Sequence, residues 1–364
     1  MKQIMKKTIC NVCIVGTVAL FLMSCTKPEP KQYKWETQRG VNIAPRITEE
    51  DFQALKPMGA NIARIAFATQ PFMELEEPYN FNEEAFKNLD RILDLCEKYE
   101  IKLLIDPHRF PGTWHPWTMI NNDKFWTDFS WHEKAISIWE RIAIQCKDRG
   151  DVIAGYDLLN EPAVPKNFVE GSPGDINLLY RKLIAAIRKH DTKHTIMLAG
   201  PRYTPADAEE ELPYIDGLDI LEAPVDDNLC YTIHMYAPMS FSHQGVWEES
   251  EFVKYPGFLD GEDWNQNKIR EYMLRAKNFT EKYGVPMFIG EFSCPRWTGD
   301  YGNQYLKDQI EVYEEYGFSW AYHAFRENQL WDVEMSNYDK NDTIRVETTP
   351  RKELLIKAFS LNKK

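Results

Sequence analysis

The sequence predicts an α/β fold, a single (β/α)8 barrel (TIM barrel), and three observations support this prediction. Eight short apolar runs of strand length recur along the chain after residue 38. Most neighbouring runs are separated by amphipathic stretches with the 3.6-residue period of a helix. No glycine-rich phosphate-binding loop follows the first run, which disfavours the competing doubly wound sheet. One barrel accounts for this alternation better than two domains do.

The expected strands end in polar residues, as barrel strands do where they reach the loops that carry active sites. These strands are predicted at residues 40–44, 61–68, 101–108, 152–160, 195–200, 230–236, 286–292 and 318–324.

The expected helices are recognised by apolar stripes, such as Phe86, Leu89 and Leu93 within residues 83–99. The others are predicted at residues 132–147, 178–189, 267–282, 304–316 and 350–359. Cys96 and Cys146 lie on two of these stripes and are interpreted as buried thiols. A disulfide between them is an open alternative in an oxidising compartment.

The N-terminus is typical of an exported bacterial lipoprotein. Three lysines precede a mostly apolar stretch, residues 9–23, that is short for a membrane span. The run Leu-Met-Ser-Cys that ends at Cys25 resembles a lipobox, so residues 1–24 are expected to be a lipoprotein signal peptide and Cys25 the lipidated residue. A plain secretory signal is the alternative. We expect an outer-membrane location or a cell-surface or periplasmic face.

Residues 25–38 lack any apolar period and are expected to form a lipidated tether, which leaves 39–364 as the barrel domain. Cleavage removes three lysines and no acidic residue, so the mature chain carries 40 basic and 56 acidic residues, a net charge of −16. Such a surface repels nucleic acid and is compatible with a neutral substrate such as a polysaccharide. We expect a monomer with a lipid anchor in the membrane.

Two glutamates each close an apolar, strand-like run. Glu161 follows Asp-Leu-Leu-Asn at 157–160, and Glu291 follows Phe-Ile-Gly at 288–290. Two facing carboxylates on a rigid scaffold are the minimum equipment for cleaving a glycosidic bond. Further polar and aromatic residues fall in the same strand-end runs: Arg64, His108, Asn160, His234, Tyr236 and Trp320.

The set resembles glycoside hydrolase family 5, the cellulase-like family of clan A retaining β-glycosidases, over nearly the whole barrel domain. The run 157–162 is similar to the family's acid/base motif, and 289–292 to its nucleophile segment. The run 106–112 matches its third-strand histidine motif, although Pro107 departs from the usual apolar residue. Residues 234–236, His-Met-Tyr, correspond to its His-x-Tyr pair.

The resemblance implies cleavage of a β-linked glucan, β-1,4-linked in the first place, or of a related plant-type polysaccharide or oligosaccharide, by double displacement. Glu161 would be the acid/base, with a raised pKa, and Glu291 the ionised nucleophile. Arg64 and Tyr236 would hold Glu291 charged. Asn160 would bond the substrate 2-hydroxyl. The remaining three residues would surround the −1 sugar, with His108 and His234 lining its site and Trp320 forming its floor.

Six tryptophans fall in expected loops on the catalytic face, and at least two of them are expected to line sugar subsites. They are Trp114, Trp117, Trp126, Trp247, Trp264 and Trp297. The loops at 203–228 and 241–261 are expected to select the substrate.

Several alternatives stay open at this point. Candidate metal ligands are too few for a good site, so no metal and no cofactor are expected. Within the same scaffold, the alternatives are a β-mannanase, an exo-acting β-glucosidase or a transglycosylase. A protein of another class, a non-catalytic glycan-binding surface lipoprotein, would keep the tryptophans but could lose either glutamate.

Overall fold

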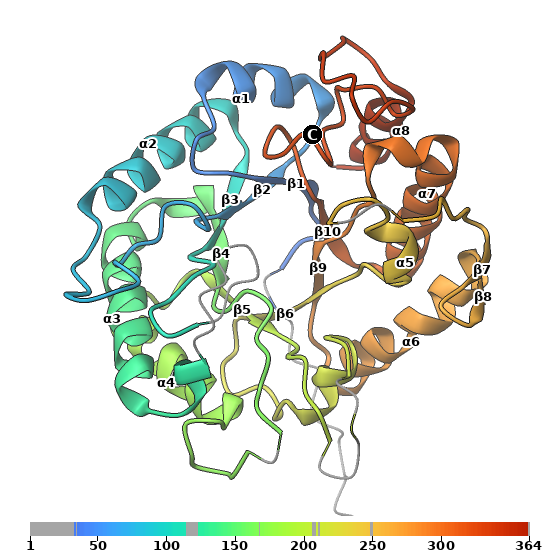
Figure 1. Cartoon of the computed structure of the whole chain (residues 1–364). Helices are drawn as coiled ribbons and strands as arrows, with labels where there is room; N and C mark the ends of the chain where they lie inside the picture. Colours follow the sequence, from blue (N-terminus) through green and yellow to red (C-terminus); the bar gives the residue numbers. More distant parts are fainter. Residues whose placement is uncertain are drawn as a thin grey trace, which may run out of the picture. The chain divides into compact units, whose positions relative to one another are not determined.

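The predicted (β/α)8 fold is confirmed. The computed structural model describes residues 33, 35–113, 123–166, 168–205, 209, 212–247 and 250–362. Within them, eight parallel strands close into a barrel in the order β1-β10-β9-β6-β5-β4-β3-β2. Figure 1 shows the strands at the centre with the long helices around them.

Each barrel strand lies within or overlaps one predicted run and is shorter at its carboxyl end, because the last residues of each run leave the sheet for the loops. The barrel strands are β1 (Arg39–Ile43), β2 (Ile62–Ala66), β3 (Lys102–Asp106), β4 (Ile153–Asp157), β5 (Thr195–Ala199), β6 (Leu229–His234), β9 (Met287–Glu291) and β10 (Ser319–Tyr322).

All six predicted helices are present, namely α2 (Glu83–Tyr99), α3 (Phe129–Cys146), α4 (Ile176–Arg188), α6 (Gln266–Tyr283), α7 (Gly299–Tyr316) and α8 (Pro350–Phe359). The prediction missed α1 (Glu49–Leu55), the short α5 (Met239–Ser242) and the hairpin of β7 (Gly257–Leu259) and β8 (Glu262–Trp264). Helix α1 is too short for a periodic signal, but Thr48 caps it through a capping box with Asp51. In the described part of the β5–β6 connection, the helical element is the 3-10 helix η4 (Asp216–Ile220).

The amino-terminal end of the barrel is filled by one apolar side chain from each of seven strands. We call this set the apolar layer: Ile62, Leu104, Ala154, Met197, Cys230, Phe288 and Ala321. Trp35 closes this end, since its ring lies 6.0 Å from that of Phe288 and its Nε1 donates to Ser319 Oγ at 2.8 Å. Trp35 therefore belongs to the folded unit, although the predicted boundary placed it in the tether.

The four cysteines among the described residues are buried free thiols. The disulfide considered between Cys96 and Cys146 is therefore not formed. In the parts of the chain that the structure describes, no helix is both long and apolar enough to cross a membrane. The predicted signal peptide and Cys25 lie outside the described residues.

Candidate active site

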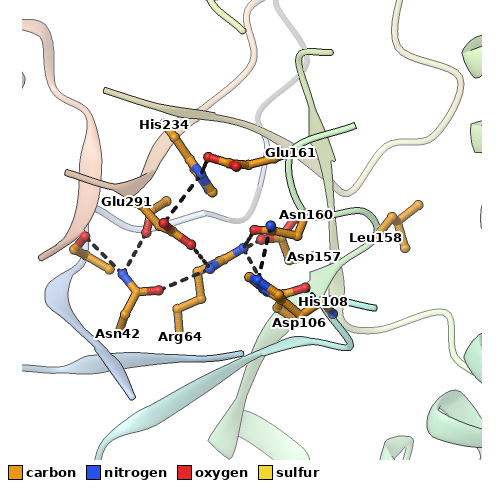
Figure 2. A network of polar contacts seen from close by, with 12 residues as sticks. Asn42, Arg64, Asp106, His108, Asp157, Leu158, Asn160, Glu161, His234 and Glu291 are labelled. Carbon is orange, nitrogen blue, oxygen red and sulfur yellow. Dashed lines mark hydrogen bonds and ion pairs between the residues drawn. The ribbon is translucent and has the colours of Figure 1, made fainter. Parts of the chain in front are cut away.

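Arg64 organises the carboxyl-terminal end of the barrel. Its side chain is fully buried, and its guanidinium contacts polar groups from four other strands and the turn after β4 (Figure 2). We call Arg64 and these partners the polar cluster; the contacts are Asp157 at 2.8 Å, Asp106, Asn160 and Glu291 at 2.9 Å, and Asn42 at 3.1 Å. One buried cation therefore faces three carboxylates.

Strand alternation brings these side chains inward. Successive residues of a strand point to opposite faces, so Arg64 shares the interior with Ile62, two residues earlier. In the same way Asp106 follows Leu104 on β3. The polar cluster therefore stands directly above the apolar layer on the same strands.

Glu291 reaches the cluster through an irregularity between β6 and β9. The pairing register shifts so that Ile233 faces Ile289 but His234 faces Glu291, and Gly290 lies in between. A Cβ at position 290 would lie 2.8 Å from His234 Nε2, so only glycine leaves room for this histidine. The irregularity thus aims Glu291 and His234 at the same point.

The nucleophile candidate Glu291 is held as an anion. Arg64 Nη1 donates to Oε1 and the Tyr236 hydroxyl donates to Oε2, both at 2.9 Å. Burial alone would raise the pKa of Glu291, but the charges of His234, His323 and Arg64 lower it well below its usual range.

Glu161 lies in the turn after β4, where its backbone adopts φ = 44°, a left-handed conformation that costs a non-glycine residue energy. Its Oε1 lies 2.8 Å from His234 Nδ1, which is also 3.7 Å from Glu291 Oε2. One ligand-type atom from each of these three residues lies within 4.8 Å of the others. The two glutamate carboxylates therefore face each other across a short gap.

The expected raised pKa of Glu161 needs correction. Burial raises the pKa, but the hydrogen bond and the charge of His234 outweigh it, and the pKa of Glu161 is lowered. Burial lowers the pKa of His234, yet the charges of Glu291 and Glu161 and the bond to Glu161 raise it overall. The contact between the two side chains therefore lowers the pKa of the glutamate and raises that of the histidine. The sequence could not indicate this coupling, because the two residues are 73 positions apart.

Asp106 holds His108 in place, and His108 in turn contacts Asn160. The backbone of His108 is left-handed, with φ = 62°. Asp106 Oδ1 accepts from the His108 amide at 2.7 Å, and Oδ2 lies 2.7 Å from the ring Nδ1. The other ring nitrogen lies 3.3 Å from Asn160 Nδ2. Asp106 therefore sets the position of both predicted substrate-binding residues.

Trp320 does not form the floor of this site. On β10 the inward residues are Ser319 and Ala321, so Trp320 points outward. It is fully buried, donates from Nε1 to Glu314 Oε1 on α7 at 2.9 Å, and stacks on Phe359 of α8. The prediction was wrong because it placed the residue on the correct strand but on the wrong face.

Continuing the inward alternation of β10 leads to His323, which the sequence analysis missed. Its amide donates to Phe292 O at 3.1 Å, and its charge is among those that lower the pKa of Glu291. Asn42, Asp106 and Asp157 were also missed as supporting residues. Counting every second residue back from each strand end would have found Asn42 and Asp106.

The loop tryptophans divide into exposed and buried members. Trp247 is 60% exposed, and its ring is stacked on His243 at 4.7 Å. His243 in turn lies 4.9 Å from the ring of Tyr236. Trp264 is buried, and Trp126 and Trp297 are half-buried. The remaining two, Trp114 and Trp117, lie outside the described residues.

Glu161, His234 and Glu291 offer the one group of potential metal ligands found among the described residues. Glu291 is already paired with the fixed cation Arg64, and His234 Nδ1 is bonded to Glu161. A metal ion would have to compete with both interactions, so this donor set fits a metal poorly. The absence of a metal and of a cofactor stays a prediction.

Comparison with known proteins gives the family. The model of the cellulase family, glycosyl hydrolase family 5, matches residues 23–329. A β-xylosidase of Phanerodontia chrysosporium is 26% identical over 303 residues, which cover 77% of this chain and 56% of that protein. Endoglucanase C of Acetivibrio thermocellus is 27% identical over 329 residues, which cover 81% of this chain and 87% of that protein. The chain thus spans little more than half of the first relative and most of the second.

Solved structures share the fold. A mutant form of Thermotoga maritima Cel5A in complex with cellobiose has a TM-score of 0.66 at 23% identity, with 88% of this chain and 96% of that chain covered. Another glycoside hydrolase has a TM-score of 0.69 at 20% identity, with 88% and 99% covered. Because the family model matches most of the sequence and these structures match the barrel, the chain belongs to glycosyl hydrolase family 5 and is a glycosyl hydrolase.

Proposed function

We propose that this protein is a retaining hydrolase of β-1,4-linked glucan, with Glu291 as the nucleophile and Glu161 as the acid/base. One observation carries the proposal: carboxylate oxygens of the two glutamates lie within 4.8 Å of each other. Retaining enzymes place their carboxyl groups about 5–5.5 Å apart, whereas inverting enzymes need about 6.5–9.5 Å to admit a water. The short gap favours a covalent glycosyl intermediate.

In the first step Glu291 attacks the anomeric carbon, and the glycosidic oxygen leaves with a proton from Glu161. The anion needed for attack is supported by Arg64 and Tyr236. The proton comes from the pair of Glu161 and His234, which are joined over 2.8 Å. In the second step a water attacks the glycosyl ester while Glu161 accepts its proton, and the anomeric configuration is retained.

Electrostatics support the change of role of Glu161 between the two steps. The charge of Glu291 raises the pKa of Glu161. Once Glu291 becomes an ester, that charge disappears and the pKa of Glu161 falls. Glu161 therefore holds a proton more readily before the first step than before the second, as an acid that becomes a base must.

The choice of glucan follows from the relatives, which include endoglucanase C and a cellodextrinase A of Ruminococcus flavefaciens, 28% identical over 214 residues. The exposed ring of Trp247, joined through His243 to Tyr236, offers a platform for a sugar close to the nucleophile. Asn160, bonded to Arg64 at 2.9 Å, is placed to bind the 2-hydroxyl of the sugar being cleaved.

We also propose that the mature chain is an exported lipoprotein anchored through Cys25. The lysines and the apolar stretch before the Leu-Met-Ser-Cys run support this proposal. Mass spectrometry of the membrane-extracted protein is expected to find a lipidated Cys25 at the N-terminus, and a soluble Cys25→Ser form should keep full glycan hydrolysis. An extracted chain that begins elsewhere would contradict the assignment.

The enzymatic proposal is tested with the soluble domain on cellulose, mixed-linkage glucan, mannan and xyloglucan. We expect reducing ends from β-1,4-glucan, and proton NMR should detect the β-anomer as the first product. Glu291→Gln should lower kcat by at least about 10⁴-fold, and Glu161→Gln by about 10²–10⁴-fold on unactivated substrate.

The matched control is Glu222→Gln, which makes the same change at an exposed carboxylate paired with Arg181. It should keep wild-type rates. Wild-type activity in either active-site variant, or the α-anomer as first product, would refute the assigned roles. Activity on mannan alone would keep the mechanism and replace the substrate.

A further inference from the structure

Glu161 has a second set of neighbours that the proposed mechanism does not use, in the segment after β5. The Arg202 amide donates to Pro162 O at 2.8 Å, and the Val164 amide donates to Arg202 O at 3.0 Å. The backbone of Arg202 is therefore bonded to the residues that directly follow Glu161. The barrel edge extends here beyond the end of β5.

The chain then folds back and brings Tyr214 to the same place. The amides of Leu212 and Tyr203 donate to each other's carbonyl oxygens, at 2.7 and 3.3 Å. A Cβ at Gly200 would lie 2.4 Å from Tyr214 O, so this close approach requires glycine. The backbone around Tyr214 is thus held against the end of β5.

The Tyr214 side chain lies close to both a cation and the acid/base pair. The Arg202 guanidinium carbon lies 5.5 Å from the centre of the Tyr214 ring, within reach of a cation–π interaction. The ring centre also lies 6.0 Å from that of His234. Tyr214 therefore contacts the histidine whose Nδ1 lies 2.8 Å from Glu161 Oε1.

The charges around Tyr214 keep its hydroxyl a proton donor. Burial raises its pKa well above 10, and the charge of Glu161 and hydrogen bonding to Glu161 also raise it; these effects outweigh the charge of Arg202, which lowers it. Arg202 acts on the same carboxyl, since its charge lowers the pKa of Glu161. The hydroxyl and the guanidinium thus both favour the Glu161 anion that remains after proton donation.

We infer that Tyr214, held by Arg202, is a positioning residue that fixes the Glu161 carboxyl toward the leaving-group oxygen. The inference rests on the proposed function of Glu161. His234 bonds one oxygen, Oε1, of a side chain that is 34% exposed. A second contact defines the plane of the carboxyl, and a misdirected acid loses much of its catalytic effect.

The test compares two substrates that share a cellobiosyl group. Cellotetraose needs a protonated leaving group, whereas 2,4-dinitrophenyl cellobioside releases a phenolate that needs almost no acid. Tyr214→Phe should lower kcat/KM for cellotetraose about tenfold or more, the size of one hydrogen bond to a charged group. For the dinitrophenyl glycoside kcat/KM should stay within about twofold.

Tyr203→Phe is the matched control, because it removes a hydroxyl from the same loop at a side chain that faces Asp219 and Asp216. This variant should leave kcat/KM unchanged for both substrates. Equal losses of Tyr214→Phe on both substrates would mean a structural role, and no loss on either would also overturn the inference. Thermal unfolding of both variants shows whether the fold is kept.

Glu161→Ala separates failure of the inference from failure of the proposed function. Like Tyr214→Phe, this variant should lose more kcat/KM on cellotetraose than on the dinitrophenyl glycoside, and the substrate bias, meaning this difference, should be larger. Azide should restore turnover of the dinitrophenyl glycoside. If Glu161→Ala lacks this bias, the proposed function itself fails. If Glu161→Ala shows it and Tyr214→Phe does not, only the inference fails.

The pH profile gives a readout that a purely structural role would not move. The titratable and charged groups acting on Glu161 are His234, Glu291, Arg202, Tyr214, Tyr236 and His243. Because Arg202 lowers the pKa of Glu161, Arg202→Met should move the basic limb of the kcat/KM profile to higher pH. Arg202→Lys, which keeps the charge, should leave the limb in place. An unmoved limb in Arg202→Met would refute the part assigned to this cation.

Discussion

The two ends of the barrel interior use the same strands for opposite purposes. On β2, Ile62 belongs to the apolar layer, and two residues later Arg64 is surrounded by carboxylates and amides. On β3, Leu104 and Asp106 repeat the pattern. One step of the strand alternation separates a hydrocarbon core from a buried ion network.

This difference distinguishes a part of the barrel that stabilises the fold from a part whose burial costs stability. Each large apolar side chain of the lower end contributes about 1.5–3 kcal/mol by leaving water. The polar cluster instead removes a guanidinium and three carboxylates from water, and apolar side chains of similar volume could replace such a network without loss of stability. Its retention at the carboxyl-terminal end is explained by the chemistry that it arranges.

The strongest test of this division is Arg64→Met. The substitution keeps much of the volume but leaves Glu291, Asp106 and Asp157 without their cation. We expect kcat/KM for cello-oligosaccharides to fall by about 10³-fold or more, equal to about 4 kcal/mol of lost transition-state stabilisation. Steady-state kinetics corrected for the folded fraction measure this loss.

Arg351→Met is the matched control for that variant. Arg351 is also fully buried, but it lies on α8 and donates to Cys294 O at 2.7 Å. Its loss should cost about 1.5–3 kcal/mol of stability while the folded fraction keeps its kcat. If both variants lose activity to the same extent, Arg64 acts through the fold and not through Glu291.

Leu104→Ala tests the lower end of the barrel. Removing this fully buried side chain from the apolar layer should lower the free energy of unfolding by about 2–5 kcal/mol, measured by urea denaturation. The kcat/KM of the folded enzyme should stay within about twofold, because the polar cluster above it carries its own hydrogen bonds. A loss of activity comparable to that of Arg64→Met would mean that the two ends cannot be separated.

Periodicity and motif spacing were sufficient to predict much of this arrangement. Eight apolar runs gave the strands, and the ends of those runs gave residues such as Arg64, His108 and Glu291, because parallel barrel strands present their carboxyl ends on one face. The prediction failed where one residue of register decides the outcome. Trp320 and His323 belong to the same expected run, yet Trp320 packs against α7 and α8 while His323 acts on Glu291.

Contacts between distant loops could not be predicted from one sequence. Tyr214 reaches Glu161 because Gly200 admits a close approach and Arg202 pairs with the residues after Glu161. Nothing in the local pattern around 214 indicates an active-site residue. The lowered pKa of Glu161 has the same origin, since it depends on a histidine from another strand.

The smallest expected effect is on stability and concerns Asp157, the member of the polar cluster whose charged form is most disfavoured by burial. Burial raises the pKa of Asp157 to about 6, although the charge of Arg64 opposes the shift. Among the described residues, its Oδ1 has no hydrogen-bond partner. Because the folded pKa lies above the ordinary value of 3.8, the folded state binds this proton more tightly than the unfolded state does. The corresponding stability is present below about pH 4 and is lost as the pH rises through about 6.

Asp157→Asn removes this titration while its amide oxygen can still accept from Arg64 Nε, the contact that Asp157 makes at 2.8 Å. Between pH 4 and pH 7, the free energy of unfolding of the variant, measured by urea denaturation, should rise relative to that of the wild type by up to about 3 kcal/mol. This amount corresponds to a difference of about two between the folded and unfolded pKa of Asp157. Glu291, whose pKa is lowered, contributes with the opposite sign but is present in both proteins and cancels in the difference. A difference that does not change with pH would mean that Asp157 stays charged in the fold. Arg64 would then offset the desolvation cost of burying Asp157 as well as that of burying Glu291. The polar cluster would in that case lower the stability of the barrel less than its burial above the apolar layer suggests.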